Sequence, residues 1–307
     1  MKFDKVLVTG GSGQLGAFVV AELMEHCQVS VLDLAPPTVD VPFFQANILD
    51  RQAVAAAMDG HDAVVQLAAL DAAVDATEQQ FFETNVQGLW NVLEAAEAAA
   101  VKRTVICSSV AAYNISAGHT PRYLPVDVDH SLAPVTAYGL SKQAGEVVAQ
   151  CFARRGPMEV RCLRPTLVMQ SDIAYDLAVT TAASDGGDPP PAASDPTWQT
   201  LSMVIPGSRA FVGPADAARC FHAALEVEGR SFDVYNVAAA DTYSPRPTLD
   251  VVQAEFNVSP EVRDTALYER DPRASIYDIS RTREELNWEP RERWSDLLAR
   301  VIAEAAG

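Results

Sequence analysis

Short runs of β-branched and aliphatic residues alternate with longer alanine-rich stretches over the first half of the chain. Buried strands of a parallel sheet are apolar along their whole length, and the helices between them cover both faces. The pattern predicts five strands, at residues 5–9, 29–33, 62–67, 103–108 and 159–163. It predicts four intervening helices, at 14–26, 51–58, 78–99 and 137–154. The expected fold class is therefore α/β, a Rossmann-like doubly wound parallel sheet with right-handed crossovers.

The pattern becomes less regular after Arg164. The stretch Ser184 to Pro196 is too rich in Pro, Gly and Asp for a helix or strand, so we expect a loop or lid there. Regular structure is predicted to resume with a helix at 214–226, a strand at 233–237 and late helices at 281–286 and 293–305.

Composition narrows the class of partner. The chain has 307 residues, 49% of them apolar, and a formal net charge of −18. This acidity argues against nucleic acid or an anionic membrane as the main partner, because both require a basic surface. We therefore expect a small-molecule partner.

The beginning of the chain and its cysteines bear on the compartment. No apolar run reaches eighteen residues, and the first strand starts almost at Met1, so a cytoplasmic protein is expected. The five cysteines form no C-x-x-C pair and show no ligand spacing with the five histidines. Neither a disulfide framework nor a metal site is expected, and the cysteines are interpreted as small buried hydrophobes.

A glycine-rich turn joins the first predicted strand to the first predicted helix. Gly10, Gly13 and Gly16 form a G-x-x-G-x-x-G spacing, with Gln14 and Leu15 opening the helix. The first glycine permits a tight turn, the second lets backbone N–H groups approach a pyrophosphate, and the third allows close helix packing. The alternative is a glycine turn that binds nothing, but the flanking strand and helix favour a dinucleotide site.

Asp33 ends the second predicted strand. A carboxylate at this position can accept both ribose hydroxyls of NAD and would repel the 2′-phosphate of NADP. The sequence therefore favours NAD as cofactor, although Asp33 could also serve as a turn residue before Pro36.

Tyr138 and Lys142 begin the helix predicted at 137–154. Their i,i+4 spacing places the phenol and the ammonium on one face. An adjacent cation and the positive charge of oxidised nicotinamide both favour the phenolate, which makes Tyr138 a candidate proton acceptor. Lys142 could also reach the nicotinamide ribose. The plainer alternative is a packed tyrosine beside a solvated lysine.

Ser109 follows the strand predicted at 103–108, at the carboxyl end of the sheet. Its hydroxyl could donate to a substrate oxygen and stabilise developing charge there. Its alternative role is that of a helix cap.

The combined motifs resemble the extended short-chain dehydrogenase/reductase family of the NAD-dependent epimerase/dehydratase type. The similarity runs from the turn at 9–16 through 66–69, 85–88, 108–109, 138–142 and 163–165 to 286–290. It implies that Tyr138 is the acid/base, Lys142 its cationic partner and Ser109 the hydrogen-bond donor to the substrate hydroxyl. It also implies a homodimer formed by the helices at about 84–100 and 137–154, with Trp90, Leu93 and Val147 as candidates for that face or for the core.

The resemblance extends the expected cofactor site and divides the chain. Further NAD contacts are expected from Asn47, Ile48, Leu67, Ala68, Ala69, Asn85 and Pro165. Residues 1–163 and 206–240 are expected to form the dinucleotide-binding domain. Residues 164–205 and 241–307 are expected to form a smaller, discontinuous C-terminal substrate-binding domain.

Departures from the family pattern concern the substrate. The run Arg164 to Gln170 lacks the asparagine and Tyr-Gly-Pro that nucleotide-sugar epimerases commonly carry. Gln66 replaces a customary histidine, and Asp216 stands in a Gly-Pro-Ala-Asp run in place of the usual Val-Asp form. Arg164 and Arg209 are candidates for holding an anionic or hydroxyl-rich substrate, or are ion-pair residues of an acidic protein.

Three functions are compatible with these residues. The favoured one is an NAD-dependent oxidoreductase that transfers hydride at a carbinol carbon of a sugar-like or small polar hydroxy compound. The second is a nucleotide-sugar epimerase or dehydratase. The third, of another class, is a regulator that binds NAD(P) only as a signal, which would not need the Tyr138, Lys142 and Ser109 set.

Overall fold

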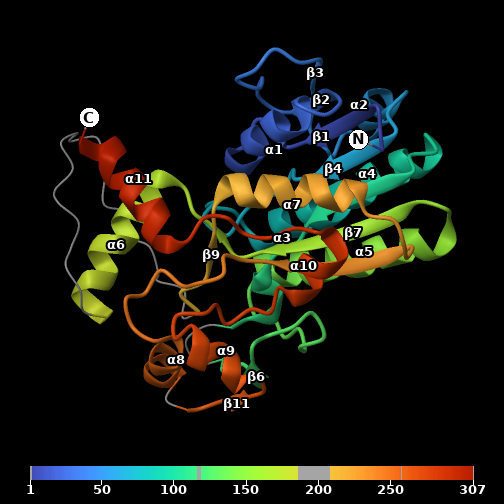
Figure 1. Cartoon of the computed structure of the whole chain (residues 1–307). Coiled ribbons are helices and arrows are strands. Elements are labelled where there is room, and N and C mark those ends of the chain that lie inside the picture. The colour runs from blue at the N-terminus through green and yellow to red at the C-terminus, as the bar shows by residue number, and fades with distance from the viewer. Residues whose placement is uncertain (1, 116–118, 186–207, 257, 307) are drawn as a thin grey trace.

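A parallel sheet of seven strands forms the centre of the computed structural model, which describes residues 2–115, 119–185, 208–256 and 258–306 (Figure 1). Every neighbouring pair of strands is parallel, and their order is β10-β7-β5-β4-β1-β2-β3. The order reverses between β1 and β4, so the carboxyl ends of these strands border the crevice where such sheets bind ligands. The strands are β1 (Lys5–Thr9), β2 (Gln28–Asp33), β3 (Phe43–Gln45), β4 (Ala63–Gln66), β5 (Arg103–Cys107), β7 (Glu159–Pro165) and β10 (Phe232–Val237).

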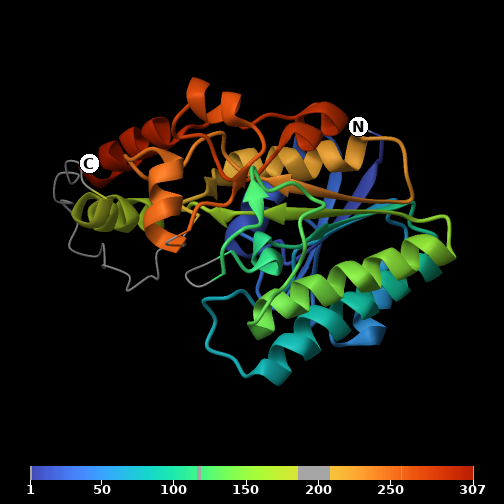
Figure 2. The same ribbon diagram turned by 90° about the horizontal axis from the view of Figure 1, so that it is seen from below.

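Helices cover both faces of this sheet. In Figure 2, α7 lies on one side of the sheet and α4 and α5 lie on the other. Apolar residues of α1 and α7 form one core with the first face, and those of α2, α4 and α5 form a second core with the opposite face. Val6 and Val8 of β1 belong to the first core and Leu7 to the second, as the alternation of side chains along a strand requires. These helices are α1 (Gln14–Met24), α2 (Arg51–Met58), α4 (Leu89–Ala98), α5 (Ala137–Arg155) and α7 (Pro214–Glu226).

The predicted fold class is confirmed, and all but one of the predicted elements begin and end within two residues of the observed ones. The exception is the helix predicted at 78–99. It consists of α3 (Glu78–Phe82), a π-helical segment η1 (Glu83–Gly88) and α4. Asn85 lies within this π turn, and such segments are often found at functional sites.

A third core lies beside the sheet. Helices α6 (Ser171–Asp185) and α11 (Trp294–Ala306) pack against each other there (Figure 1). The sequence pattern did not predict α6, and Ser184 and Asp185 end this helix, where a loop was expected. The rest of the stretch predicted as a lid, residues 186–196, lies outside the described residues.

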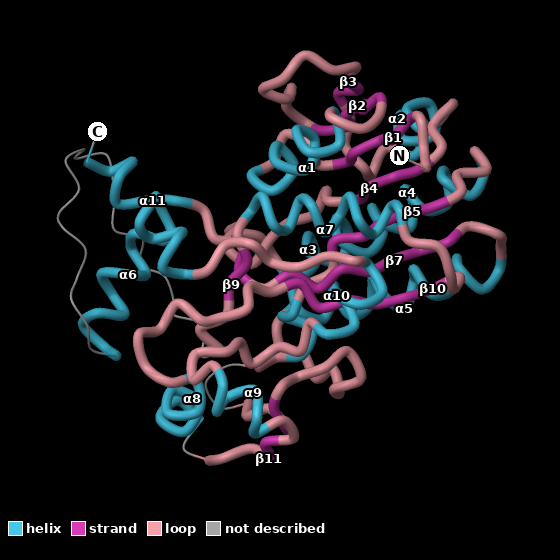
Figure 3. The backbone as a smooth tube through the Cα atoms, in the orientation of Figure 1, coloured by secondary structure: helices cyan, strands magenta, loops and turns pink. Residues whose placement is uncertain are grey.

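Short elements connected by loops complete the chain (Figure 3). Two small parallel sheets pair β6 with β11 and β8 with β9. The remaining elements are β6 (Tyr123–Leu124), the 3-10 helix η2 (Val110–Tyr113), β8 (Leu167–Val168), β9 (Phe211–Val212), α8 (Thr248–Phe256), β11 (Glu261–Val262), α9 (Thr265–Arg270) and α10 (Ser280–Leu286).

Asp216, in the first turn of α7, fixes the late part of the chain to the sheet domain. Its carboxylate accepts the backbone N–H groups of Arg291 and Glu292 at 2.8 and 2.9 Å. Its carbonyl accepts the indole N–H of Trp288 at 3.0 Å. The Gly-Pro-Ala-Asp run therefore contacts the motif at 286–290 directly.

The five cysteines differ in burial. Cys162 and Cys220 are buried, Cys27 and Cys107 are half-buried, and Cys151 is exposed, so the expectation of uniform burial is wrong for the last. Within the described ranges, no helix combines the length and the apolar character that crossing a bilayer would require.

Candidate active site

The glycine-rich turn joins β1 to α1 at the crevice. Gly10 has a φ of +74°, a conformation that side chains disfavour, and a Cβ there would lie 2.5 Å from the backbone nitrogen of Ala68. A Cβ at Gly16 would clash with the carbonyl of Gly10. Only that same carbonyl oxygen, at 3.3 Å, lies within 4 Å of a Cβ built at Gly13. The first and third glycines are therefore required by the fold itself, whereas a Cβ at Gly13 would make one tight contact with a backbone oxygen.

The first turn of α1 suits an anion. Gly13 is the N-cap, so no side chain caps the helix, and Gln14 and Leu15 contribute backbone N–H groups there. A helix N-terminus without a capping side chain favours negative charge through its N–H groups and its dipole. This turn therefore fits the pyrophosphate of a dinucleotide.

Asp33 lies next to this turn. Its carboxylate accepts the backbone N–H of Ser12 at 2.9 Å and that of Leu34 at 2.6 Å. Each carboxylate oxygen can accept more than one hydrogen bond. Asp33 is thus fixed at the end of β2 and can still accept hydroxyl groups, in the position predicted for the ribose.

The segment after β4 faces the glycine turn from the other side of the crevice. Leu67 and Ala68 both donate their backbone N–H groups to the carbonyl of Thr9, at 3.0 and 3.1 Å. Ala69 follows them, and all three are half-buried. The structure therefore places these predicted cofactor residues beside β1, at the point where the strand order reverses.

Asn85 connects this segment to α5. Its side chain donates to the carbonyl of Leu70 at 2.9 Å and to the hydroxyl of Ser141 at 3.0 Å. Its side-chain oxygen accepts the N–H of Leu70 at 2.8 Å. These bonds satisfy a buried amide within the chain, so Asn85 positions the segment and the helix.

Asn47 and Ile48 lie before α2. Asn47 is exposed and accepts the N–H of Leu49 at 2.9 Å. Ile48 is buried, and its carbonyl accepts the amide of Asn91 at 3.0 Å. Their contact with adenine stays a prediction.

The three residues predicted to be catalytic come together at the carboxyl end of β5. Lys142 is buried on α5, donates to the carbonyl of Cys107 at 2.9 Å and lies 5.5 Å from the centre of the Tyr138 ring. Ser109 caps η2 by accepting the N–H of Ala111 at 3.1 Å, as its alternative role expected. Its hydroxyl also lies close enough to the phenol of Tyr138 to lower the pKa of that phenol. Ser109 therefore fills the capping role, and its hydrogen bond to a substrate oxygen stays a prediction.

The protonation of Tyr138 depends on opposing effects. Burial raises the pKa of Tyr138, and the ammonium of Lys142 and the hydrogen bond from Ser109 partly offset this rise. Lys142 thus acts in the expected direction but does not overcome burial in the chain alone.

Arg164 is paired within the chain, in line with the ion-pair alternative considered for it, and its contact with a substrate stays a prediction. Its guanidinium forms two hydrogen bonds with Glu146, at 2.8 and 2.7 Å, and donates to the phenol oxygen of Tyr113 at 2.6 Å. Burial opposes the charge of Arg164, but the bonds to Glu146 outweigh it and raise the pKa of the guanidinium. Glu146 also accepts the hydroxyl of Ser108 at 2.5 Å. Residue 164 therefore belongs to a buried network that fixes α5 against β5 and β7.

Sequence reasoning missed Glu146, the centre of this network. It stands four residues after Lys142 on the same face of α5. A carboxylate on a buried helix face needs a cationic partner, and that signal could have indicated Arg164.

The other predicted residues lie near the same end of the sheet. Pro165 is buried at the end of β7. Arg209 is buried, and its guanidinium lies 3.8 Å from the carboxylate of Glu255. Contact of Pro165 with the cofactor and of Arg209 with a substrate stay predictions.

A doubly wound parallel sheet, a glycine turn before α1 and a Tyr-Lys-Ser group after β5 together define a dinucleotide-dependent enzyme of the short-chain dehydrogenase/reductase class. Residues 6–184 match the model of the NAD dependent epimerase/dehydratase family. The chain belongs to this family, and it is an NAD-dependent enzyme.

Individual relatives agree with this assignment. The chain is 32% identical to L-arabinose 1-dehydrogenase (NAD(P)(+)) of Haloferax volcanii over 55% of its own length and 68% of that protein. It is 26% identical to UDP-glucose 4-epimerase of Lactobacillus helveticus over 96% of its own length and 95% of that protein. Its fold is similar to that of a short-chain dehydrogenase/reductase superfamily protein from Agrobacterium tumefaciens with bound NAD, with a TM-score of 0.71, 23% identity and coverage of 97% and 96%.

Proposed function

We propose that this enzyme transfers hydride between NAD and a carbinol carbon of a sugar-like or small polar hydroxy compound that carries no nucleotide. The observation that carries the proposal is the convergence of Tyr138, Lys142 and Ser109 at the carboxyl end of β5. The three side chains supply a proton acceptor, a cation and a hydroxyl donor within one site.

Each residue has a separate part in the proposed reaction. The phenol oxygen of Tyr138 takes the proton of the substrate hydroxyl as the carbinol carbon loses hydride. The hydroxyl of Ser109, which lowers the pKa of Tyr138, donates to the substrate oxygen. Lys142 favours the phenolate through its charge. NAD, when bound, accepts the hydride and brings a positive charge near the phenol.

The residues that border the crevice fit NAD. We propose that Gly13, Gln14 and Leu15 hold the pyrophosphate and that Asp33 accepts the ribose hydroxyls of the adenosine half. The carboxylate of Asp33 is fixed by two backbone N–H groups, so it would repel a 2′-phosphate rather than move away from it. This supports NAD over NADP.

The substrate class is supported by sequence and by relatives. The run from Arg164 to Gln170 lacks the residues with which the related epimerases hold a nucleotide sugar. The match to an L-arabinose dehydrogenase agrees with a free sugar. The second candidate is a nucleotide-sugar epimerase, which the almost full-length match to UDP-glucose 4-epimerase favours.

Cofactor reduction separates the two candidates. The purified chain is incubated with NAD and with free aldoses, uronates or UDP-sugars, and the nicotinamide absorbance is followed. Net accumulation of NADH with a free sugar supports the proposal, whereas inversion of a UDP-sugar without accumulation supports the epimerase. A Tyr138→Phe variant that still binds NAD should lose about 10²–10⁴-fold in kcat in either case. A fully active variant would refute the assigned proton transfer.

We further propose a homodimer formed by α4 and α5. Leu93 is fully buried within the chain and is excluded from such an interface. Trp90 and Val147 are 37% and 64% exposed. The ring of Trp90 packs edge-to-face with that of Phe152, with the ring centroids 5.0 Å apart. Large apolar side chains exposed on neighbouring helices favour association.

Domain division and compartment complete the proposal. We assign residues 1–163 and 206–240 to cofactor binding, and residues 164–205 and 241–307 to substrate binding. The cytoplasm is the proposed compartment, which the scattered cysteines of the sequence support.

A further inference from the structure

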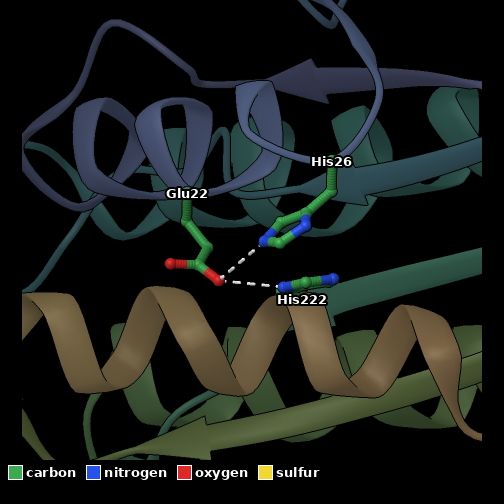
Figure 4. Close-up of side chains that lie close together, drawn as sticks. All are labelled: Glu22, His26 and His222. Atoms are coloured by element: carbon green, nitrogen blue, oxygen red, sulfur yellow. Dashed lines mark hydrogen bonds and ion pairs between the residues drawn. The ribbon is translucent and has the colours of Figure 1, made fainter. Parts of the chain in front are cut away.

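Two histidines and a glutamate meet between α1 and α7. Glu22 lies on α1, His26 follows the end of that helix, and His222 lies on α7 (Figure 4). One carboxylate oxygen of Glu22 is 2.9 Å from Nδ1 of His222 and 3.6 Å from Nε2 of His26. Glu22 and His222 are 200 residues apart in the sequence, so the spacing of residues along the chain does not indicate the cluster.

The spacing of these atoms suits a tetrahedral metal ion. Zinc binds imidazole nitrogen and carboxylate oxygen at about 2.0–2.2 Å, which places neighbouring ligand atoms about 3.3–3.5 Å apart. The two contacts of Glu22 lie on either side of this range, and one ligand atom from each of the three residues lies within 4.8 Å of the others. Small rotations of the side chains would equalise the distances.

The imidazole rings add a second geometric indication. The rings of His26 and His222 lie with centroids 4.0 Å apart and planes inclined by 33°. This arrangement brings one nitrogen of each ring to the same carboxylate oxygen of Glu22, where a single cation could bind all three groups. The side chains of His26, Glu22 and His222 are 37%, 22% and 18% exposed, so an ion can enter from solvent.

We propose that Glu22, His26 and His222 bind one divalent transition metal ion of the zinc type, with water at the fourth position. Two imidazoles and one carboxylate are a ligand set that zinc accepts in proteins. The net charge of −18 adds a general attraction for cations. This proposal replaces the sequence-based expectation of no metal site.

The bound ion would connect two helices of the cofactor domain without touching the active site. Glu22 is nine residues beyond Gly13, about 14 Å along the helix axis. An ion that binds only the folded chain stabilises it by mass action. Zinc should therefore raise the melting temperature of the chain and leave its affinity for NAD unchanged.

Titration with zinc tests the proposal. Chain freed of metal by EDTA and dialysis is titrated with ZnCl₂ by calorimetry. The wild type and a His119→Gln control, which removes an exposed histidine outside the cluster, should each bind one tight equivalent. His26→Gln and His222→Gln should each bind at least about tenfold more weakly, because even outer partners of metal ligands are worth 10–100-fold. Unchanged NAD affinity shows that each variant is folded.

Two results of the zinc titration would overturn the site. One is a wild-type chain that shows no tight equivalent of zinc and no rise in melting temperature. The other is a folded His222→Gln variant that binds zinc as tightly as the control, which would leave a hydrogen-bonded Glu-His cluster only. Cobalt(II) absorption of the wild-type chain provides a measurement that needs no variant: a tetrahedral ion gives strong visible bands, and a spectrum equal to that of aqueous cobalt contradicts the proposal.

Discussion

Replacing Arg164 by methionine tests whether this arginine is structural. Its side chain is 5% exposed and that of Glu146 is 8% exposed, so the pair is almost completely removed from water. The Arg164→Met variant would leave the carboxylate of Glu146 buried with the hydroxyl of Ser108 as its remaining partner in this network. Removing one partner of a buried ion pair costs about 3–5 kcal/mol.

This free energy converts into a melting temperature. An unfolding entropy of about 2.1 cal/mol/K per residue gives about 0.64 kcal/mol/K for the chain. The Arg164→Met variant should therefore melt about 5–8 °C below the wild type, as measured by circular dichroism or calorimetry. Arg51→Met is the matched control, because Arg51 forms an exposed ion pair with Glu94 and should change the melting temperature by less than about 2 °C.

Two outcomes would refute this reasoning. A substrate-binding Arg164 would raise KM in the variant and leave its melting temperature unchanged. A double variant, Arg164→Met with Glu146→Leu, should recover most of the lost stability, because replacing both partners by apolar residues removes the buried charge. Failure of the double variant to melt above Arg164→Met would show that the destabilisation does not come from an unpaired carboxylate.

Three further predictions concern the cofactor site and its surroundings. The Lys142→Met variant should shift the rise of kcat/KM for substrate oxidation to higher pH. The ammonium of Lys142 lowers the pKa of Tyr138, so without it burial raises that pKa further. An unshifted pH profile contradicts this prediction. Gly13→Val should weaken NAD binding and lower the melting temperature less than Gly16→Ala does, because a Cβ at Gly13 makes one tight contact with the carbonyl of Gly10 whereas a Cβ at Gly16 overlaps it. Equal stability of the two variants in thermal denaturation contradicts this. Asp216→Ala should cost about 2–4 kcal/mol, measured by urea denaturation, because it removes two backbone hydrogen bonds and the ion pair with Arg219. An unchanged unfolding midpoint would show that the late segment is held elsewhere.

Local chemistry explains which parts could be predicted. The glycine turn, Asp33 and the Tyr138-Lys142 pair depend on neighbouring residues and on the periodicity of single elements, so the turn, the strand end and the helix that carry them could be predicted. The partner of Arg164 could not be named from the sequence, because Glu146 comes from a different element that only tertiary packing brings near. The burial that raises the pKa of Tyr138 also results from tertiary packing. It could not be predicted from the residues next to Tyr138 in the sequence.

Helices were missed where periodicity was weak. The helix α6 combines apolar, acidic and small residues without a clear polar face, and its partner α11 follows more than a hundred residues later. Its stability comes from that contact rather than from intrinsic preference. The π turn around Asn85 is similar, since its extra width accompanies hydrogen bonds to Leu70 and Ser141 on other elements.

The strand order has a consequence for synthesis of the protein. The edge strand β10 and the covering helix α7 both come after residue 184, where the family match ends. Until the ribosome has released them, one apolar face of β1, β5 and β7 has α1 as its cover but lacks α7. A nascent chain at this stage exposes surface that favours aggregation or chaperone binding. Slow translation of the segment between residue 184 and the end of β10 should therefore reduce the yield of native protein, even though the finished fold is unchanged.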